Sequence, residues 1–350
     1  MSLEIRAPDR AGTDAPSWLI VLAMAGSTLL VQPQEPLTLL AAGAVLPGAG
    51  VAVLTLVTLL AYRADMPRLA ASATAFLQMT VFTLLALVLS YAIAAQGGAL
   101  WDDRLAAWDR SLGIDWPALR AGLDRTPLLA WATGLAYHSL IPQMILVIVA
   151  LGALGRLEAL RVTTCAAVIA GFATVLLSGL FPAMGNLFDP AGYRNLWPPI
   201  AWLHADTIAG LRDGSLRVLD LREMMGIVTF PSYHAALAAI FIWAFRQAGP
   251  LRLLGGGWAL LTILATPIGG GHYLVDVLAG LLLALVSLGL AQRLVQLPAT
   301  LGASSRRLAP PVLQPGSCGI RPPAAPAAAC QGGRAFRLTR DKFDKFGVFR

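Results

Sequence analysis

The chain has 350 residues, of which 57% are hydrophobic and only 13% are charged. A soluble domain carries about 25% charged residues. This composition, with a mean hydropathy of +0.69, excludes an ordinary soluble globular domain and predicts a polytopic membrane protein. The net charge of +7 comes from arginines scattered singly between apolar segments, which argues against a nucleic-acid partner.

Eight apolar segments follow one another along the chain and predict an all-α, polytopic transmembrane helical bundle. A helix that crosses a bilayer needs about 20 mostly apolar residues, and the first, sixth and seventh segments are shorter than the others. The predicted spans are Ser17–Val31, Leu37–Tyr62, Leu69–Ala95, Pro127–Leu154, Val162–Phe181, Ser232–Ala248, Leu251–Ile268 and His272–Leu297.

These spans divide the chain into three parts. Residues 1–16 form a short N-terminal segment, residues 17–298 form the transmembrane domain, and residues 299–350 form a tail. The tail turns to Pro, Ala and Gly and then to a basic end. Such a composition cannot bury a core and predicts disorder.

Arginines occur in alternate linkers between the predicted spans. By the positive-inside rule these linkers face the cytoplasm, which puts both termini on the cytoplasmic side of a bacterial-type plasma (inner) membrane. The long linkers Gln96–Thr126 and Pro182–Pro231 are then extracytoplasmic. The cytoplasmic arginines are Arg63, Arg68, Arg156, Arg161, Arg246, Arg252, Arg293, Arg306 and Arg307.

The first extracytoplasmic linker is expected to contain one amphipathic helix in the headgroup layer, because apolar residues recur at steps of three or four. The aspartates between them, such as Asp102 and Asp103, are interpreted as a solvated helix face rather than as metal ligands. No metal or cofactor is expected. The recurring apolar residues are Trp101, Leu105, Trp108 and Leu112.

Two histidines receive structural interpretations. The second extracytoplasmic linker is expected to be a loop with aromatic anchors and a short surface helix, and His204 is expected to be a solvated loop residue. His138 lies about 15 Å into the fourth span by helix rise and is interpreted as part of the packing.

Two short motifs combine the other two histidines with a serine and a carboxylate, each where a polar turn meets an apolar run. They are Phe230-Pro231-Ser232-Tyr233-His234 and Gly271-His272-Tyr273-Leu274-Val275-Asp276. His272 and Asp276 are four residues apart, so on a helix they share one face. The carboxylate can then fix one imidazole nitrogen and leave the other free to attack.

The first motif begins the sixth span and suits a phosphate. Ser232 can cap this helix and donate its hydroxyl to a phosphate oxygen, beside the unpaired N–H groups of the helix start. Because the sixth and seventh spans form an antiparallel pair, His272 returns to the side of His234. One histidine can attack phosphorus while the other protonates the leaving oxygen. The alternative is a structural polar network at span ends, but the shared side of these groups favours catalysis.

The segments FPSYHA and GGHYLVDVLAG resemble the second and third signatures of the type-2 phosphatidic acid phosphatase superfamily. They are most similar to its inositolphosphorylceramide synthase-like (inositolphosphotransferase) branch, and the resemblance covers residues 101–297 approximately. It implies a bundle with a core of six spans. It also implies that His272 is the nucleophile, Asp276 its orienting partner and His234 the general acid, with Ser232 in contact with the phosphate.

The chain departs from the superfamily in its basic residues. The first signature, a lysine followed by Arg-Pro, is not found, and Thr266 stands where an arginine usually precedes the third-signature histidine by six residues. The charge of the phosphate must then be met by other groups. Arg104, Arg194 and Arg222 lie on the same predicted side, and Arg194 is taken as the substrate-binding candidate.

These features predict an integral membrane lipid phosphotransferase that acts on a lipid phosphoester, among membrane lipids, through a phosphohistidine at the extracytoplasmic face. Two alternatives stay open. If water replaces the acceptor alcohol, the protein is a lipid phosphate phosphatase. A non-enzymatic lipid-binding or transport bundle would keep only a vestigial site, although a transporter usually shows interrupted spans in matched halves, and none is evident.

Overall fold

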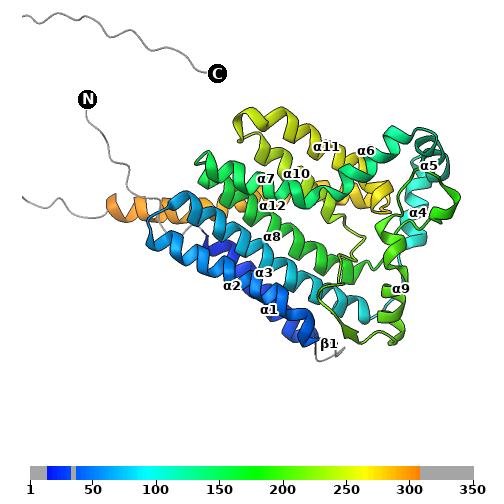
Figure 1. Ribbon diagram of the computed structural model, residues 1–350, viewed down its shortest axis with the longest axis horizontal. Helices are drawn as coiled ribbons and strands as arrows, with labels where there is room; N and C mark the ends of the chain where they lie inside the picture. Colours follow the sequence, from blue (N-terminus) through cyan, green and yellow to red (C-terminus); the bar gives the residue numbers. More distant parts are fainter. Residues whose placement is uncertain (1–13, 33–36, 308–350) are drawn as a thin grey trace, which may run out of the picture. The chain divides into compact units, whose positions relative to one another are not determined.

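The computed structural model describes residues 14–32 and 37–307, which form a bundle of α-helices (Figure 1). Residues 1–13 of the predicted N-terminal segment and residues 308–350 of the predicted tail lie outside this description. Two short strands, β1 (Thr38–Leu39) and β2 (Val218–Leu219), pair in parallel. The helices are α1 (Ala15–Val31), α2 (Ala41–Arg63), α3 (Pro67–Ala95), α4 (Asp102–Ser111), α5 (Trp116–Asp124), α6 (Pro127–His138), α7 (Leu140–Ala153), α8 (Leu157–Leu180), α9 (Ile200–Asp213), α10 (Tyr233–Phe245), α11 (Arg252–Gly269) and α12 (Leu274–Arg307), with short 3-10 turns η1 (Pro190–Gly192) and η2 (Gly249–Leu251).

The predicted all-α membrane bundle is confirmed. Among the described residues, five helices are long and apolar enough to cross a membrane: α2, α3, α8, α11 with η2, and α12. The pair α6 and α7, bent by 56°, can form a sixth span. Helices α1 and α10 correspond to the first and sixth predicted spans and are apolar, but have only 17 and 13 residues.

The bend between α6 and α7 has a local cause and a local compensation. Pro142 lacks an N–H group, and its ring clashes with the carbonyl four residues earlier, at His138, where α6 ends. Backbone groups freed at such a break need partners inside a bilayer. The hydroxyl of Thr262 on α11 donates to the Ala136 carbonyl over 2.8 Å and accepts from the Gln143 amide over 2.7 Å. Helix α11 therefore supports the bend.

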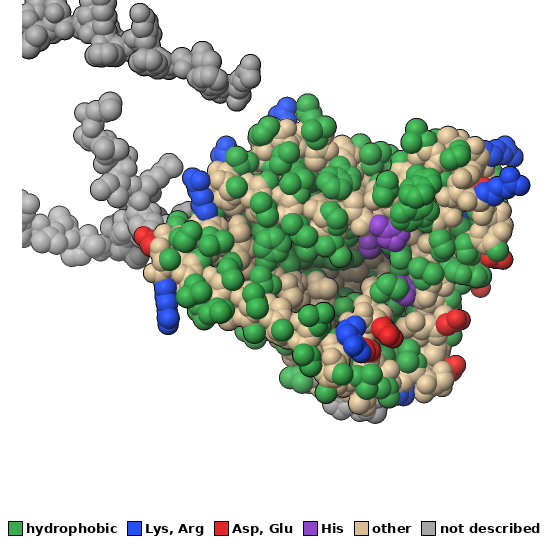
Figure 2. All heavy atoms as spheres, in the orientation of Figure 1, with side chains coloured by type: hydrophobic (Ala, Val, Ile, Leu, Met, Phe, Trp, Pro, Cys, Tyr) green, Lys and Arg blue, Asp and Glu red, His purple; other side chains and the backbone are tan. Residues whose placement is uncertain are grey.

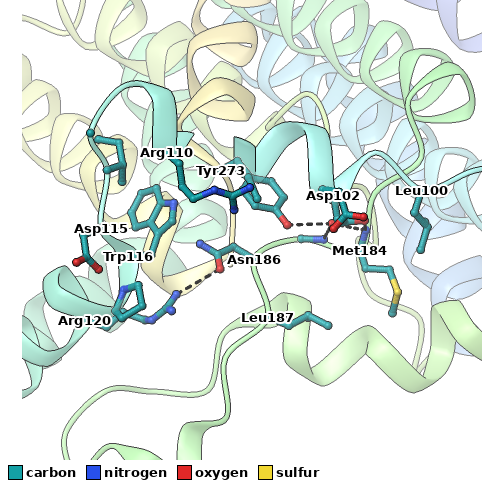
Figure 3. Close-up of a pocket in the computed structure, with 16 residues that line it drawn as sticks. Leu100, Asp102, Arg110, Asp115, Trp116, Arg120, Met184, Asn186, Leu187 and Tyr273 are labelled. Atoms are coloured by element: carbon teal, nitrogen blue, oxygen red, sulfur yellow. Dashed lines mark hydrogen bonds between the residues drawn. The ribbon is translucent and has the colours of Figure 1, made fainter. Parts of the chain in front are cut away.

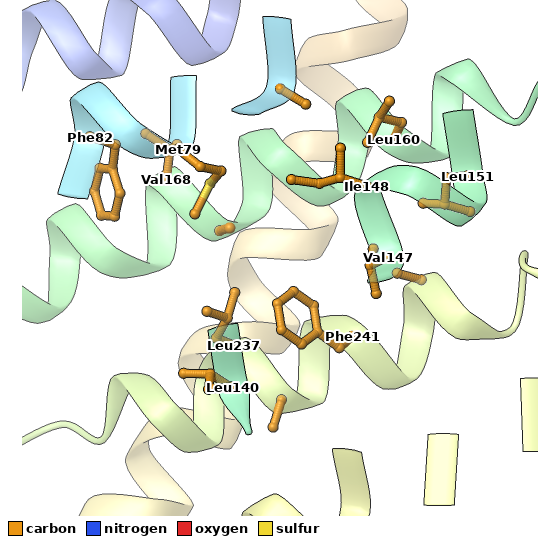
Figure 4. Close-up of a cluster of buried hydrophobic side chains, with 14 of the residues drawn as sticks. Met79, Phe82, Leu140, Val147, Ile148, Leu151, Leu160, Val168, Leu237 and Phe241 are labelled. Atoms are coloured by element: carbon orange, nitrogen blue, oxygen red, sulfur yellow. The ribbon is translucent and has the colours of Figure 1, made fainter. Parts of the chain in front are cut away.

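The largest apolar core lies where α3, α7, α8 and α10 meet (Figure 4). Phe241 on α10 and Leu151 on α7 are 1% and 0% exposed, and they pack with Val168 of α8. Large apolar side chains on the outer helix surfaces are exposed, and they dominate the face shown in Figure 2. This arrangement is the one expected of helices surrounded by lipid.

The connections divide between the two ends of the bundle. The turns α2–α3, α7–α8 and α10–α11 share one end, which we call the turn end, and α4, α5 and α9 lie at the other, the loop end (Figure 1). At the turn end, the Arg68 guanidinium donates to the Ala153 carbonyl over 3.2 Å. Both histidine motifs start helices at the loop end, as their common side in the sequence predicted.

The amphipathic helix predicted in the first linker is present as α4, and a second helix, α5, follows it in the same linker. The segment forms two helices, α4 and α5, separated by a turn in which Gly113 has a φ of +77°. Glycine adopts this left-handed conformation readily, and Asp115 caps the second helix by accepting the Ala118 N–H over 3.0 Å. The short surface helix expected in the second linker is present as α9.

Candidate active site

The two histidine motifs meet through their backbones. The hydroxyl oxygen of Ser232, the N-cap of α10, accepts the Ala235 N–H over 3.3 Å. The Ser232 N–H in turn donates to the Asp276 carbonyl, in the first turn of α12, over 3.0 Å. A Cβ at Gly280 would clash with the Ser232 carbonyl oxygen. This glycine therefore allows α12 to approach the start of α10.

The Asp276 carboxylate faces the imidazole of His272. Nδ1 of His272 lies 3.5 Å from Oδ2 of Asp276, which is longer than an ordinary hydrogen bond. The same oxygen accepts the Tyr273 N–H over 2.8 Å. Both side chains are buried, with 4% of His272 and none of Asp276 exposed. Because the carboxylate attracts a proton to Nδ1, Nε2 is the nitrogen that keeps a lone pair for attack.

The turn that precedes His272 is held by the second linker. Gly271 has a φ of +72°, a conformation that favours glycine. Its carbonyl accepts the Asn186 N–H over 2.6 Å, and the Gly270 carbonyl accepts the Ala201 N–H over 3.1 Å. Residues distant in sequence therefore set the position of the His272 ring.

Tyr137, near the end of α6, lies beside both histidines. Its ring is stacked on His234, with 4.3 Å between ring centroids and 11° between planes. A Cβ on Gly270 would clash with the His272 ring and lie 2.9 Å from the Tyr137 hydroxyl, so the hydroxyl and that ring are near neighbours. His234 and His272 are therefore both neighbours of Tyr137. The structure thus brings His234, His272 and Asp276 together.

The three candidate arginines do not join this group. Arg222 is paired with Asp220, and this pairing lowers the pKa of Asp220 to about 2. Arg104 lies over the Trp101 ring, 4.4 Å from its centroid. Arg194 is exposed, and only its backbone N–H bonds with Asp124. Within the described chain, none of the three forms a hydrogen bond or ion pair with either histidine.

Asp124 holds the loop that carries Arg194. Its carboxylate accepts the backbone N–H groups of Arg194, Asn195 and Leu196. These bonds, that of Asn195 above all, lower the pKa of Asp124. The position of Arg194 is therefore set by α5.

The remaining histidines differ from each other. The interpretation of His204 as a solvated loop residue is wrong, because it lies in α9 with 3% exposure, and this burial lowers the pKa of its imidazole. Its neighbour Ala201 packs against the turn before His272, which explains the burial. His138 ends α6 and is exposed, with its ring 5.4 Å from the Trp197 ring, and its structural role stays a prediction. Histidine side chains border a hollow on the face shown in Figure 2.

The interpretation of the linker aspartates as a solvated face agrees with the exposed side chain of Asp103, but it is wrong for Asp109 and does not describe the partly buried Asp102. Asp109 is 1% exposed, and its Oδ2 accepts the Trp116 indole N–H over 2.8 Å and the Leu274 N–H, at the start of α12, over 2.9 Å. Asp102 accepts two backbone N–H groups of the second linker and the Tyr273 hydroxyl. Buried carboxylates are retained where such donors satisfy them. The burial of Asp109 could have been indicated by its position four residues after Leu105, on the apolar face of the helix.

A cavity of about 910 Å³ opens beside Tyr273, between α4, α5 and the second linker (Figure 3). Arg120 lines it and is the buried residue of α5. Arg120 is not among the site residues predicted from the sequence. Its position four residues after Trp116 and three before Leu123, on the apolar side of a short helix, is the signal that could have indicated it.

A family model described as the PAP2 superfamily matches residues 103–290, more than half of the chain, including both histidine motifs. The chain belongs to the PAP2 superfamily. This membership confirms the superfamily predicted from the two motifs and, with the apolar helices, identifies an integral membrane enzyme of the phosphatase type that acts on lipid substrates. The match does not distinguish branches of the PAP2 superfamily. No curated protein and no solved structure matches the chain.

Proposed function

We propose that this PAP2 protein is an inositolphosphotransferase-like lipid phosphotransferase, which moves the phosphoryl group of a lipid phosphoester to an alcohol through a phosphohistidine on His272. The observation that carries the proposal is the facing pair of His272 and Asp276, joined through the backbone to the start of α10, where His234 lies. A buried carboxylate beside a buried imidazole is an arrangement that activates a nucleophile.

In the first step, Nε2 of His272 attacks phosphorus, the N–P bond forms, and the P–O bond to the leaving group breaks. His234 gives its proton to the leaving oxygen. Asp276 stabilises the positive charge that develops on the attacking imidazole. Ser232 and the N–H groups at the start of α10 donate to the phosphate oxygens in this proposal.

In the second step, the acceptor alcohol gives its proton to His234, its oxygen attacks phosphorus, and the N–P bond breaks. His272 is then free again. Arg194 remains the candidate cation for the phosphate charge, because its exposed side chain forms no hydrogen bond or ion pair among the described residues.

The cavity beside Tyr273 favours transfer over hydrolysis, because about 910 Å³ of lined space next to the turn of His272 can hold a second substrate. In the hydrolytic alternative, water performs the second step. In the non-enzymatic alternative, the histidines only support a lipid-binding or transport bundle.

We also propose that the loop end faces the extracytoplasmic side of a bacterial-type inner membrane, with both termini cytoplasmic. Arginines at the turn end support this orientation through the positive-inside rule, notably Arg63, Arg68 and Arg156.

The test is incubation of the purified protein with labelled lipid phosphates and phosphodiesters, with and without polyol acceptors, in ¹⁸O-labelled water. Transfer gives a phosphorylated alcohol without ¹⁸O, whereas hydrolysis gives a phosphate that contains it. His272→Ala should lose either activity by about 10⁴-fold or more, while elution volume and melting temperature stay close to those of the wild type. Substantial turnover in His272→Ala would remove the basis of the proposal, and no turnover of any lipid by the wild type would favour the non-enzymatic alternative.

A further inference from the structure

Arg120 is a buried cation that lacks a counter-charge. Only 7% of the residue is exposed, and no carboxylate of the described residues forms an ion pair with it. Its guanidinium donates to the Asn186 amide oxygen over 3.4 Å and lies 4.5 Å from the centroid of the Phe188 ring. Its Nε donates to no acceptor among the described residues.

Asn186 contributes a second unused donor. The Arg120 guanidinium has only N–H groups, so it fixes the Asn186 amide with the oxygen toward itself and the NH₂ group away. That Nδ2 is buried and has no acceptor in the described structure. Arg120 and Asn186 both line the cavity beside Tyr273 and lie against each other there (Figure 3).

A buried charge without a partner is expensive, and so are buried N–H groups that donate to nothing. An anionic group at this point of the cavity would accept from both residues and compensate the Arg120 charge. Guanidinium groups bind phosphate and carboxylate oxygens well because their N–H donors match the spacing of these oxygens.

Three carboxylates, those of Asp102, Asp103 and Asp115, line the same cavity and would repel an anion. The attraction for an anion is therefore confined to the part of the wall near Arg120. Asp102 is occupied by the Met184 and Gly185 N–H groups, and Asp115 by the cap of α5. The exposed Arg110 of α4 adds a second guanidinium to the wall. The cavity thus offers one buried cationic point within a mixed polar wall.

This point lies next to the proposed reaction site. The Asn186 N–H donates to the Gly271 carbonyl, immediately before His272, and Tyr273 lines the cavity wall. We propose that Arg120 and Asn186 form a binding site for an anionic group, a phosphate or a carboxylate, that is distinct from the reacting phosphorus. If the proposed function is correct, this site implies that one substrate carries a second anionic group. That group belongs either to a lipid headgroup or to a soluble acceptor.

The test compares variants of the purified full chain in phosphatidylcholine nanodiscs. Asn186→Asp is almost isosteric and supplies Arg120 with an internal carboxylate, so it should fold as well as the wild type while it competes with the anion. Arg120→Gln removes the cation. Arg125→Gln is the matched control, because Arg125 follows the same helix but is exposed and does not line the cavity.

Inorganic phosphate and short-chain phosphatidic acid are the probes, and the readout is the rise in melting temperature with probe concentration. The wild type, Arg125→Gln and His272→Ala should show the rise. Asn186→Asp should lose it, with at least tenfold weaker binding, although its melting temperature without probe is equal to or above that of the wild type. A response to phosphate assigns a soluble anion as the source, and a response to phosphatidic acid alone assigns a lipid headgroup.

An undiminished rise in Asn186→Asp and Arg120→Gln would overturn the site, and so would no rise in the wild type with either probe. His272→Ala separates the two proposals, because it removes the proposed nucleophile and leaves Arg120 and Asn186 in place. The anion site can therefore be refuted while the phosphotransferase proposal stands, and the phosphotransferase proposal can be refuted while the anion site stands.

Discussion

The backbone N–H of Ser232 donates to the carbonyl oxygen of Asp276 over 3.0 Å, which joins the start of α10 to the first turn of α12. Ser232 and Asp276 are 44 positions apart in the sequence. This bond places the cap of one helix beside the carboxylate of the other. Any change in the packing of α10 against α12 should therefore alter the relation between the two histidines.

Gly280 tests this packing. Gly280→Ala adds a Cβ that clashes with the Ser232 carbonyl oxygen, and overpacking of this kind costs about 1–3 kcal/mol of stability. We expect a lower melting temperature and reduced turnover. Gly289→Ala in the same helix is the control, because its Cβ would meet nothing within 4 Å. Equal melting temperatures for the two variants would show that α12 does not depend on the close approach.

Asp109 should be required for the position of the second motif, which contains His272 and Asp276. Asp109→Ala leaves the Leu274 N–H and the Trp116 indole N–H without their acceptor, at a cost of about 1–3 kcal/mol for each unsatisfied group. We expect a lower melting temperature and a loss of activity. Asp103→Ala, at an exposed position in the same helix, should change stability little. The role of Asp109 is refuted if both variants melt like the wild type.

A covalent phosphohistidine should accumulate most readily when His234 is replaced. With a substrate that has a good leaving group, the first step needs little acid help, so His234→Ala should form the adduct and resolve it slowly. Asp276→Asn should form it slowly, because the imidazole loses the carboxylate that faces Nδ1. Acid-labile label is measured after rapid quenching. Label on protein that lacks His272 would show that the nucleophile is another residue.

Cysteine labelling tests the orientation. In a background with Cys165, Cys318 and Cys330 replaced, a cysteine at Tyr193 should react with a membrane-impermeant thiol reagent in intact cells. A cysteine at Arg156, at the turn end, should react only after the membrane is opened. The opposite labelling pattern would reverse the proposed topology.

The sequence alone determined the class of the protein and the residues of its two motifs. Apolar composition and span length require a helical membrane bundle, because lipid offers backbone groups no other partners. The four-residue spacing of His272 and Asp276 predicted that their side chains would face each other, and they do, although His272 lies in the turn before α12 and not in the helix itself. The prediction that both motifs lie on the same side of the membrane followed from the number of predicted spans between them.

Only the tertiary structure decided what surrounds these motifs. The spacing of Asp109 is compatible with a solvated face or a buried one, and the choice depends on the Leu274 N–H, which lies 165 residues away. Tyr137, next to the break between α6 and α7, stacks on His234, and Arg120 is buried against Asn186 and Phe188 of the second linker. Hydrophobic periodicity can place Asp109 and Arg120 on the apolar faces of their helices, but it does not identify the distant backbone donors and rings that these side chains contact.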